Sequence, residues 1–313
     1  MRILLTGSSG MLGSAIHETL LQEKSNLEVF APASSDLDLL DSNLLEEKIA
    51  QFKPNQIIHC AAKVGGIQAN IDDPFSFFSS NIQMDFNLLN AAKIHGVESL
   101  FYFGSSCMYP AVTNQPILES QILTGELEKT NEGYALAKIL ATKYVSMIAT
   151  QFNLDWHVFV LSNLYGPGDK YSERSSHLVA AIIQKIDSAM NTRSKSVEMW
   201  GDGLAKREFT YVKDVASFIV NAIGETKSMP SVMNLGASED FTVRSYYEKI
   251  AKVMGFVGEI IPLPEKPVGM KRKLMDSSLA VSHGWNPKTD LELGLLETIE
   301  RYRSDRKVFN GEE

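Results

Sequence analysis

Tyr134 and Lys138 stand four residues apart in the segment NEGYALAK, which has a helical pattern. Side chains four apart project from one face of a helix, so a phenol and an ammonium would lie side by side. The positive charge favours phenolate and is expected to lower the tyrosine pKa from its usual value of about 10. Such a pair can donate or accept a proton near neutral pH, which is the chemistry of an active site.

A serine completes the set of groups needed to reduce a carbonyl. The apolar segment SLFYFGSS ends in Ser105 and Ser106, and ligands of parallel sheets bind beyond the carboxyl ends of the strands. In such a set Ser105 orients the substrate oxygen and Tyr134 delivers a proton as hydride arrives. Lys138 tunes the tyrosine and holds the nicotinamide ribose. Without the Tyr-Lys pair, Ser105 would be read as a turn residue.

The first thirteen residues predict the site for the hydride donor. They read as strand, tight turn and helix start, with Gly7, Gly10 and Gly13 three residues apart. The first glycine permits a sharp exit from the strand, the second lets backbone approach a pyrophosphate, and the third lets the helix lie close to the sheet. The free amides and dipole of the helix N-terminus attract phosphates. A dinucleotide cofactor is therefore expected here.

The next strand, LEVFAP, is followed by Ser34 and Ser35 and has no acidic residue directly at its end. An acid at that place binds the ribose hydroxyls in NAD sites, so its absence favours NADP(H). Asp41 fits two interpretations equally, an acceptor for the adenine amino group or a helix N-cap.

The third strand, NQIIHCAAKVGG, ends in small residues. Ala61, Ala62 and Lys63 would pass beside the cofactor, and Gly65 and Gly66 would leave room for substrate. His59 and Cys60 lie inside the strand and are interpreted as core residues.

Strands and helices alternate to about residue 165, which predicts an α/β fold with a doubly wound, Rossmann-like parallel sheet. The later sequence is less regular and predicts a smaller α+β substrate-binding domain. We therefore expect a dinucleotide-binding domain over residues 1–165, to which 213–236 return, and a substrate domain over 166–313.

Composition limits the classes of function. The chain has 313 residues and a formal net charge of −8, which argues against non-specific nucleic-acid binding. An apolar strand begins after two residues and leaves no room for a signal peptide, and no apolar run is long enough to span a bilayer. Two cysteines make neither a disulfide framework nor a zinc site. A cytoplasmic enzyme without a metal and without a membrane partner is expected.

Several longer motifs resemble the GDP-L-fucose synthase family of extended short-chain dehydrogenases/reductases. They are FGSSCMYP, NLYGPGD, MWGDGLAKREFTYVKD and RKLMD, and the similarity runs through nearly the whole chain. The resemblance implies a homodimeric, NADP-dependent oxidoreductase that is also an epimerase. Such an enzyme inverts carbons 3 and 5 of GDP-4-keto-6-deoxymannose and then reduces carbon 4.

The same resemblance gives roles to residues outside the reductase triad. Cys107 and His177 match the family's base and acid for the inversions, and a thiol and an imidazole can exchange protons near neutral pH. Lys185, Trp200, Arg207 and Asp276 match positions that hold the GDP moiety. Taken singly, these four residues would be read as core or surface residues.

The predicted catalytic residues are Ser105, Cys107, Tyr134, Lys138 and His177. The predicted cofactor-binding residues are Gly7, Ser8, Ser9, Gly10, Met11, Leu12, Gly13, Asp41, Ala61, Ala62, Lys63, Phe103, Gly104, Ser105, Ser106, Tyr134, Lys138, Leu161, Ser162, Asn163, Leu164 and His177. The predicted substrate-binding residues are Gly65, Gly66, Asn163, Lys185, Trp200, Arg207 and Asp276.

Four alternatives stay open at this stage. One is action on a related GDP-4-keto sugar, a dideoxyhexose or a 6-deoxyheptose, and another is reduction without epimerisation. A third is a UDP-sugar 4-epimerase with tightly bound NAD, and a fourth is a non-catalytic protein on the same fold. The presence of Cys107 and His177 favours epimerisation. The intact Tyr-Lys pair argues against a non-catalytic protein.

Overall fold

The computed structural model describes residues 1–24, 26–172, 176–266 and 268–310, with side chains through residue 306. Six parallel strands form its main sheet in the order β2-β1-β3-β4-β5-β9. The order reverses between β1 and β3, which opens a crevice at their carboxyl ends. The predicted doubly wound parallel sheet is confirmed. Its strands are β1 (Arg2–Thr6), β2 (Glu28–Phe30), β3 (Gln56–His59), β4 (Ser99–Ser105), β5 (Asp155–Leu161) and β9 (Val232–Leu235).

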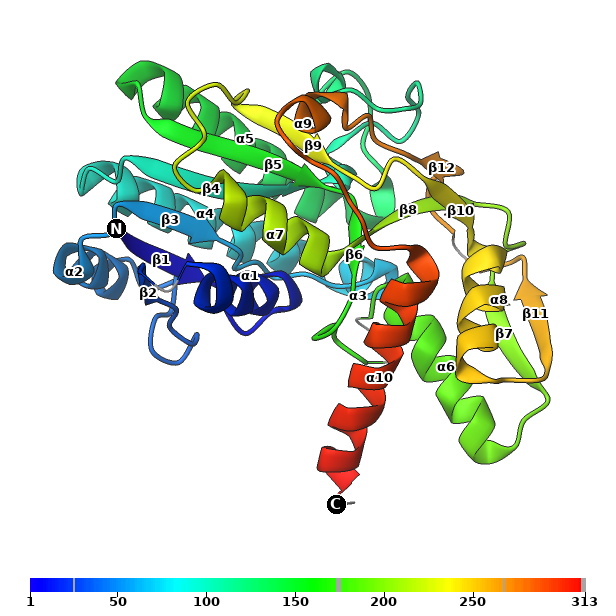
Figure 1. Ribbon diagram of the computed structural model, residues 1–313. Coiled ribbons are helices and arrows are strands. Elements are labelled where there is room, and N and C mark those ends of the chain that lie inside the picture. The colour runs from blue at the N-terminus through cyan, green and yellow to red at the C-terminus, as the bar shows by residue number, and fades with distance from the viewer. Residues whose placement is uncertain (25, 173–175, 267, 311–313) are drawn as a thin grey trace.

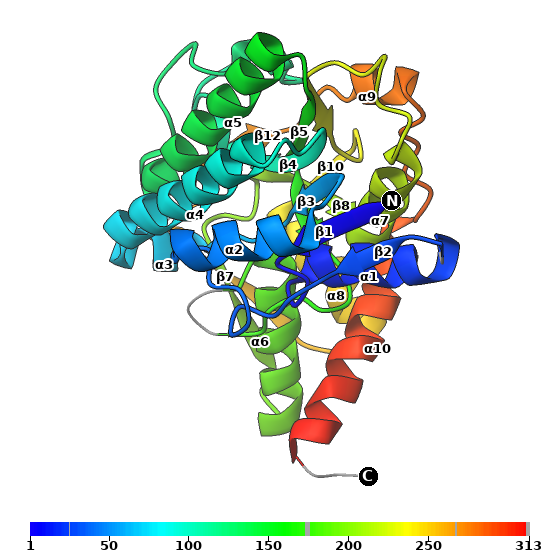
Figure 2. The ribbon, with the colours of Figure 1, turned by 90° about the vertical axis from the view of Figure 1, so that its left-hand side faces the viewer.

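Helices cover both faces of this sheet (Figures 1 and 2). One face packs against α2 (Ser42–Phe52), α4 (Pro74–Ile94) and α5 (Glu132–Phe152), and the other against α1 (Met11–Glu23), α7 (Val212–Ala222) and α9 (Ser278–Ser282). Helix α4 begins at Pro74. Proline suits the first helical position, and the Asp73 carboxylate accepts from the Ser76 amide.

The smaller part of the molecule has its own core (lower right of Figure 1). Strand β8 (Lys206–Tyr211) pairs with β6 (Asn163–Tyr165), β10 (Asp240–Thr242) and β12 (Arg272–Lys273), and β7 (Ser196–Trp200) pairs with β11 (Glu259–Leu263). Helices α6 (Leu178–Thr192), α8 (Val243–Met254) and α10 (Leu291–Asn310) pack with these strands. This mixed α+β layer lies beyond the carboxyl ends of the main strands.

Short elements link these parts: α3 (Ile67–Asp72), η1 (Ser106–Met108), η2 (Glu119–Gln121) and η3 (Lys129–Asn131). Helix α7 packs beside α1, and β9 joins the sheet edge next to β5. The domain boundaries given above stay a prediction. Among the described residues, no helix is both long and apolar enough to cross a membrane.

Candidate active site

The glycine-rich turn is shaped by close backbone contacts. Gly7 has a φ of +70°, and a Cβ there would lie 2.5 Å from the Ala61 nitrogen. A Cβ on Gly13 would lie 2.1 Å from the Gly7 oxygen, so both positions require glycine. Gly10 caps α1 without any side-chain hydrogen bond, which leaves the first amides of the helix available. This cradle fits the pyrophosphate of a nicotinamide dinucleotide.

Residues at the ends of β2 and β3 surround this turn. The Ser8 hydroxyl donates to the Ala31 carbonyl at 3.2 Å, while Ser9, Ser34 and Ser35 are exposed. The Asp41 carboxylate accepts from the Asn43 and Leu44 amides, so it is the N-cap of α2. Its contact with adenine stays a prediction.

Asn81 holds the chain that follows β3, and sequence reasoning missed it. The Lys63 amide donates to Asn81 Oδ1 at 2.9 Å, and Asn81 Nδ2 donates back to the Lys63 carbonyl at 3.0 Å. Ala61, Ala62 and Gly65 in this segment are half-buried. A fully buried side-chain amide on α4 therefore fixes the wall predicted to lie beside the cofactor.

Ser105 and Cys107 meet at the end of β4. The Ser105 hydroxyl caps η1 and lies 2.8 Å from Cys107 Sγ. Cys107 is buried, with 7% of its surface exposed. Phe103, Gly104 and Ser106 are buried around them. A thiol thus lies beside the hydroxyl expected to bind a carbonyl oxygen.

Tyr134 and Lys138 project from the first turns of α5. Lys138 is 2% exposed, and its ammonium donates to the Tyr102 hydroxyl at 2.9 Å and lies 3.9 Å from Asp85 Oδ2. Burial raises the pKa of Tyr134, and the charges of Cys107 and Asp85 raise it further. The expected lowering of this pKa by Lys138 is therefore wrong for this structure. The cause is the burial of the phenol, to which the charges of Cys107 and Asp85 add.

His59 and Cys60 lie in the sheet and its adjoining loop, as expected of core residues. His59 Nε2 lies 2.9 Å from Asp85 Oδ1, and burial lowers the pKa of the imidazole. Burial raises the pKa of the Cys60 thiol.

The residues after β5 and His177 belong to the part of the chain that crosses from the main sheet to the smaller layer. His177 is the half-buried N-cap of α6, and its pKa is lowered by burial and by the charge of Lys170. No contact within the described residues joins it to Cys107. Asn163 Nδ2 donates to the Glu208 carbonyl at 3.0 Å. Ser162 and Leu161 are buried, and Met11, Leu12 and Leu164 are half-buried.

Three of the predicted nucleotide-sugar residues, Lys185, Trp200 and Arg207, lie on α6, β7 and β8 of the smaller layer. Lys185 Nζ lies 5.5 Å from the centre of the Trp200 ring and donates to the Glu198 carbonyl at 3.1 Å. Arg207 donates to the carbonyls of Lys206 at 2.8 Å and Val268 at 2.6 Å. Burial lowers the pKa of both cations.

Lys273 is a further cation that the prediction omitted. It is half-buried on β12, and burial lowers its pKa, with the charges of Cys107 and Arg207 as neighbours. The motif RKLMD contains both Lys273 and Asp276, but the resemblance assigns the nucleotide contact to Asp276. The Asp276 carboxylate accepts from the Ser278 amide at 2.8 Å, and no contact within the described part of the chain joins it to Arg207. Its contact with the nucleotide stays a prediction.

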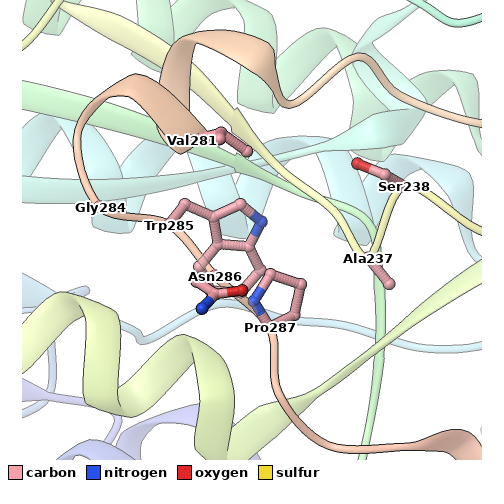
Figure 3. Close-up of a pocket in the computed structure, with 7 residues that line it drawn as sticks. All are labelled: Ala237, Ser238, Val281, Gly284, Trp285, Asn286 and Pro287. Carbon is pink, nitrogen blue, oxygen red and sulfur yellow. The ribbon is translucent and has the colours of Figure 1, made fainter.

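A pocket of about 560 Å³ lies elsewhere (Figure 3). It is lined by Ala237, Ser238, Val281, Gly284, Trp285, Asn286 and Pro287. None of these residues is a predicted ligand or catalytic group. The predicted catalytic and ligand-binding residues therefore lie outside this pocket.

The sheet, the glycine cradle and the Ser-Tyr-Lys set are typical of a nicotinamide-dependent oxidoreductase. The chain belongs to the NAD dependent epimerase/dehydratase family, whose model matches residues 3–236. It is 44% identical to GDP-L-colitose synthase of Yersinia pseudotuberculosis over 98% of this chain and 99% of that protein. It is 40% identical to GDP-L-fucose synthase of Azorhizobium caulinodans over 98% of each. The resemblance seen in the motifs is confirmed.

A solved structure shows the same fold. The GDP-mannoheptose C4 reductase of Campylobacter jejuni, with NADP bound, has a TM-score of 0.86 and 25% identity. The match covers 96% of this chain and 98% of that one.

Proposed function

We propose that this enzyme is a GDP-sugar epimerase and reductase. It inverts carbons 3 and 5 of GDP-4-keto-6-deoxy-D-mannose and reduces carbon 4 with NADPH to give GDP-L-fucose. The observation that carries this proposal is the 2.8 Å contact between Ser105 Oγ and Cys107 Sγ in a site that also has Tyr134 and Lys138. Because a simple reductase needs no thiol there, the contact favours proton exchange next to the carbonyl.

Reduction uses the three groups of the sheet. Ser105 orients the oxygen on carbon 4, and Tyr134 donates its proton to that oxygen. The nicotinamide supplies hydride when bound. The raised pKa of Tyr134 keeps the phenol protonated before the transfer, as a proton donor requires.

Epimerisation uses the ketone at carbon 4, which acidifies the hydrogens on carbons 3 and 5. Cys107 removes a proton as thiolate, and His177 returns one to the opposite face. Lys273 is the cation near Cys107, and a nearby cation stabilises a thiolate. The lowered pKa of His177 makes its imidazolium a stronger proton donor.

The nucleotide is held by local cations, because the whole chain is acidic. Arg207 can make paired bonds to the pyrophosphate, and Lys273 and Lys185 add positive charge. Trp200 provides an aromatic face, and Gly65 and Gly66 leave space for the sugar.

Two proposals accompany this function. The cradle takes NADP(H), since no acidic residue stands directly at the end of β2 and a structural relative holds NADP. The enzyme forms a homodimer through α4 and α5, which expose apolar side chains that include Ile94, Leu140 and Met147. A monomeric mass at micromolar concentration would contradict the dimer. A cytoplasmic location stays a prediction.

GDP-L-colitose is a second candidate product, favoured by the 44% identical relative. Colitose is a dideoxyhexose without a hydroxyl on carbon 3, so only carbon 5 would need inversion. A comparison of kcat/KM for the two 4-keto substrates separates the candidates. A 6-deoxyheptose substrate is tested in the same way.

The experiment incubates the enzyme with NADPH and GDP-4-keto-6-deoxymannose in heavy water, followed by NMR of the product. Deuterium at carbons 3 and 5 with NADPH consumed is the expected result. NADPH consumption without deuterium would leave a simple 4-reductase. No reaction, together with turnover of the dideoxy substrate, would establish the second candidate.

A further inference from the structure

Five side chains from five elements form one hydrogen-bonded chain beneath the site. Thr6 of β1 lies 2.7 Å from His59 Nδ1 of β3, and His59 Nε2 lies 2.9 Å from Asp85 Oδ1 of α4. Tyr102 of β4 donates to Asp85 Oδ2 at 2.7 Å and accepts from Lys138 of α5 at 2.9 Å. The chain therefore joins the end of the strand before the glycine turn to the lysine of the catalytic pair.

This hydrogen-bonded series of side chains is buried, and it contains the carboxylate of Asp85 and the ammonium of Lys138. The side chains of His59 and Asp85 are 0% exposed, and that of Lys138 is 3% exposed. Burial acts to raise the pKa of Asp85, but the charge of Lys138 and the hydrogen bond from His59 outweigh it and leave the pKa lowered. Buried charges are costly unless they are paired and hydrogen-bonded. This arrangement satisfies both conditions.

A second Asp-His pair in the same sheet provides a comparison. Asp155 and His157 of β5 also lie 2.9 Å apart, at the amino end of the strand and away from Tyr134. Asp155 is 36% exposed and contacts Thr226 as well as His157. That pair contacts no catalytic lysine, so pairing of aspartate with histidine alone does not explain the chain at Lys138.

We infer that Asp85 is a positioning residue: held by His59 and Tyr102, it fixes the Lys138 ammonium and thereby sets the pH range over which Tyr134 donates a proton. The inference rests on the proposed role of the Tyr134-Lys138 pair in reduction. An unopposed lysine would favour phenolate, which has no proton to give. The carboxylate of Asp85 offsets that effect.

The titratable groups that influence the pKa of Tyr134 or the charge around Lys138 lie on several neighbouring elements. Asp85 acts on both Tyr134 and Lys138, and Cys107 of η1 acts on Tyr134. Lys138 in turn acts on His59 and on Cys60. Lys273 of β12 lies near Cys107. Asp85 is the carboxylate that contacts Lys138 among the described residues.

The first test is the pH dependence of kcat/KM for reduction by Asp85→Asn. Without the carboxylate, either the phenol of Tyr134 or the ammonium of Lys138 should lose its proton at a lower pH. The alkaline limb should therefore move down by about one pH unit or more. Tyr102→Phe should move it in the same direction by less. Asp155→Asn is the matched control and should keep the wild-type limb. An unchanged limb in folded Asp85→Asn would overturn the inference.

The second test needs neither cofactor nor substrate. Melting temperatures of Lys138→Met, Asp85→Asn and the double variant are measured without ligand. Each single variant leaves an unpaired buried partner, so the summed single losses should exceed the double loss by about 4 °C or more. Additive losses would overturn the inference. Failure of the proposed function appears differently, as wild-type protein that turns over neither GDP-4-keto sugar.

Discussion

The two sides of the crevice hold their side chains in different ways. On the sheet side, Ser105, Cys107, Tyr134 and Lys138 stand on β4, η1 and α5, and Lys138 is tied to side chains within the sheet. The lobe side consists of His177, Lys185, Trp200, Arg207 and Lys273. Of these residues, Lys185 and Arg207 donate to main-chain carbonyls and are half-buried.

This difference indicates that the sheet side carries out proton transfer and that the lobe side binds the nucleotide. Groups that transfer protons must be held to a fraction of an ångström, which buried elements provide. Cations held through carbonyl contacts can change partners when a pyrophosphate arrives. Substitutions on the sheet side should therefore reduce kcat, whereas those on the lobe side should raise KM.

Tyr134→Phe gives the largest expected effect. Loss of the phenolic proton should reduce kcat for NADPH oxidation about 1,000-fold, because a positioned acid contributes that order of rate. The dissociation constant for NADPH, measured by fluorescence, should change little. Near-normal NADPH oxidation by this variant would show that Tyr134 is not the proton donor. The catalytic role assigned to the sheet side would then be wrong.

Cys107→Ser should have the next largest effect, on epimerisation alone. A hydroxyl is a far weaker base than a thiolate, so deuterium exchange at the sugar should slow by about 100-fold or more. Cys60→Ser is the matched control because Cys60 is the other cysteine of the chain. Equal exchange rates in the two variants would show that Cys107 is not the base.

Arg207→Met tests the lobe side. Loss of charged hydrogen bonds to the pyrophosphate should raise KM for the GDP sugar about 10- to 100-fold and leave kcat within a few-fold. Lys206→Met is the control, since Lys206 precedes it on β8 and points to the opposite face. A large fall in kcat with unchanged KM would contradict the proposal that the lobe side acts in binding rather than in catalysis.

The sequence predicts the sheet side better than the lobe side, for a physical reason. The glycine turn and the Tyr134-Lys138 spacing are local patterns, and each is fixed by the geometry of one element. Asp85 and Tyr102 meet Lys138 only through packing of three elements, so no local pattern reveals them. The pKa of Tyr134 is raised mainly because the phenol is buried, with smaller contributions from the charges of Cys107 and Asp85, and no local pattern reveals this burial either.

The lobe side depends on long-range contacts throughout. Lys273 lies opposite Arg207 because β12 pairs with β8 in parallel, although these strands are far apart in the sequence. The motif RKLMD marked the segment but not the residue. Asn81 is a similar case, since a polar residue within an apolar helix gives no sign that it holds the backbone of Lys63.

Lys170→Gln is expected to have the smallest effect. It tests His177, the lobe-side residue to which a chemical step is assigned. His177 lies there but is assigned a chemical step, and the positive charge of Lys170 contributes to its lowered pKa. Removing that charge should raise the pKa of His177. The limb of the pH profile for deuterium exchange that reports imidazolium should then move up by a few tenths of a unit, because exposed charges are screened. Lys143→Gln, an exposed lysine on α5, should leave that limb unchanged. A downward shift, or an equal shift in both variants, would mean that the limb reports a group other than His177.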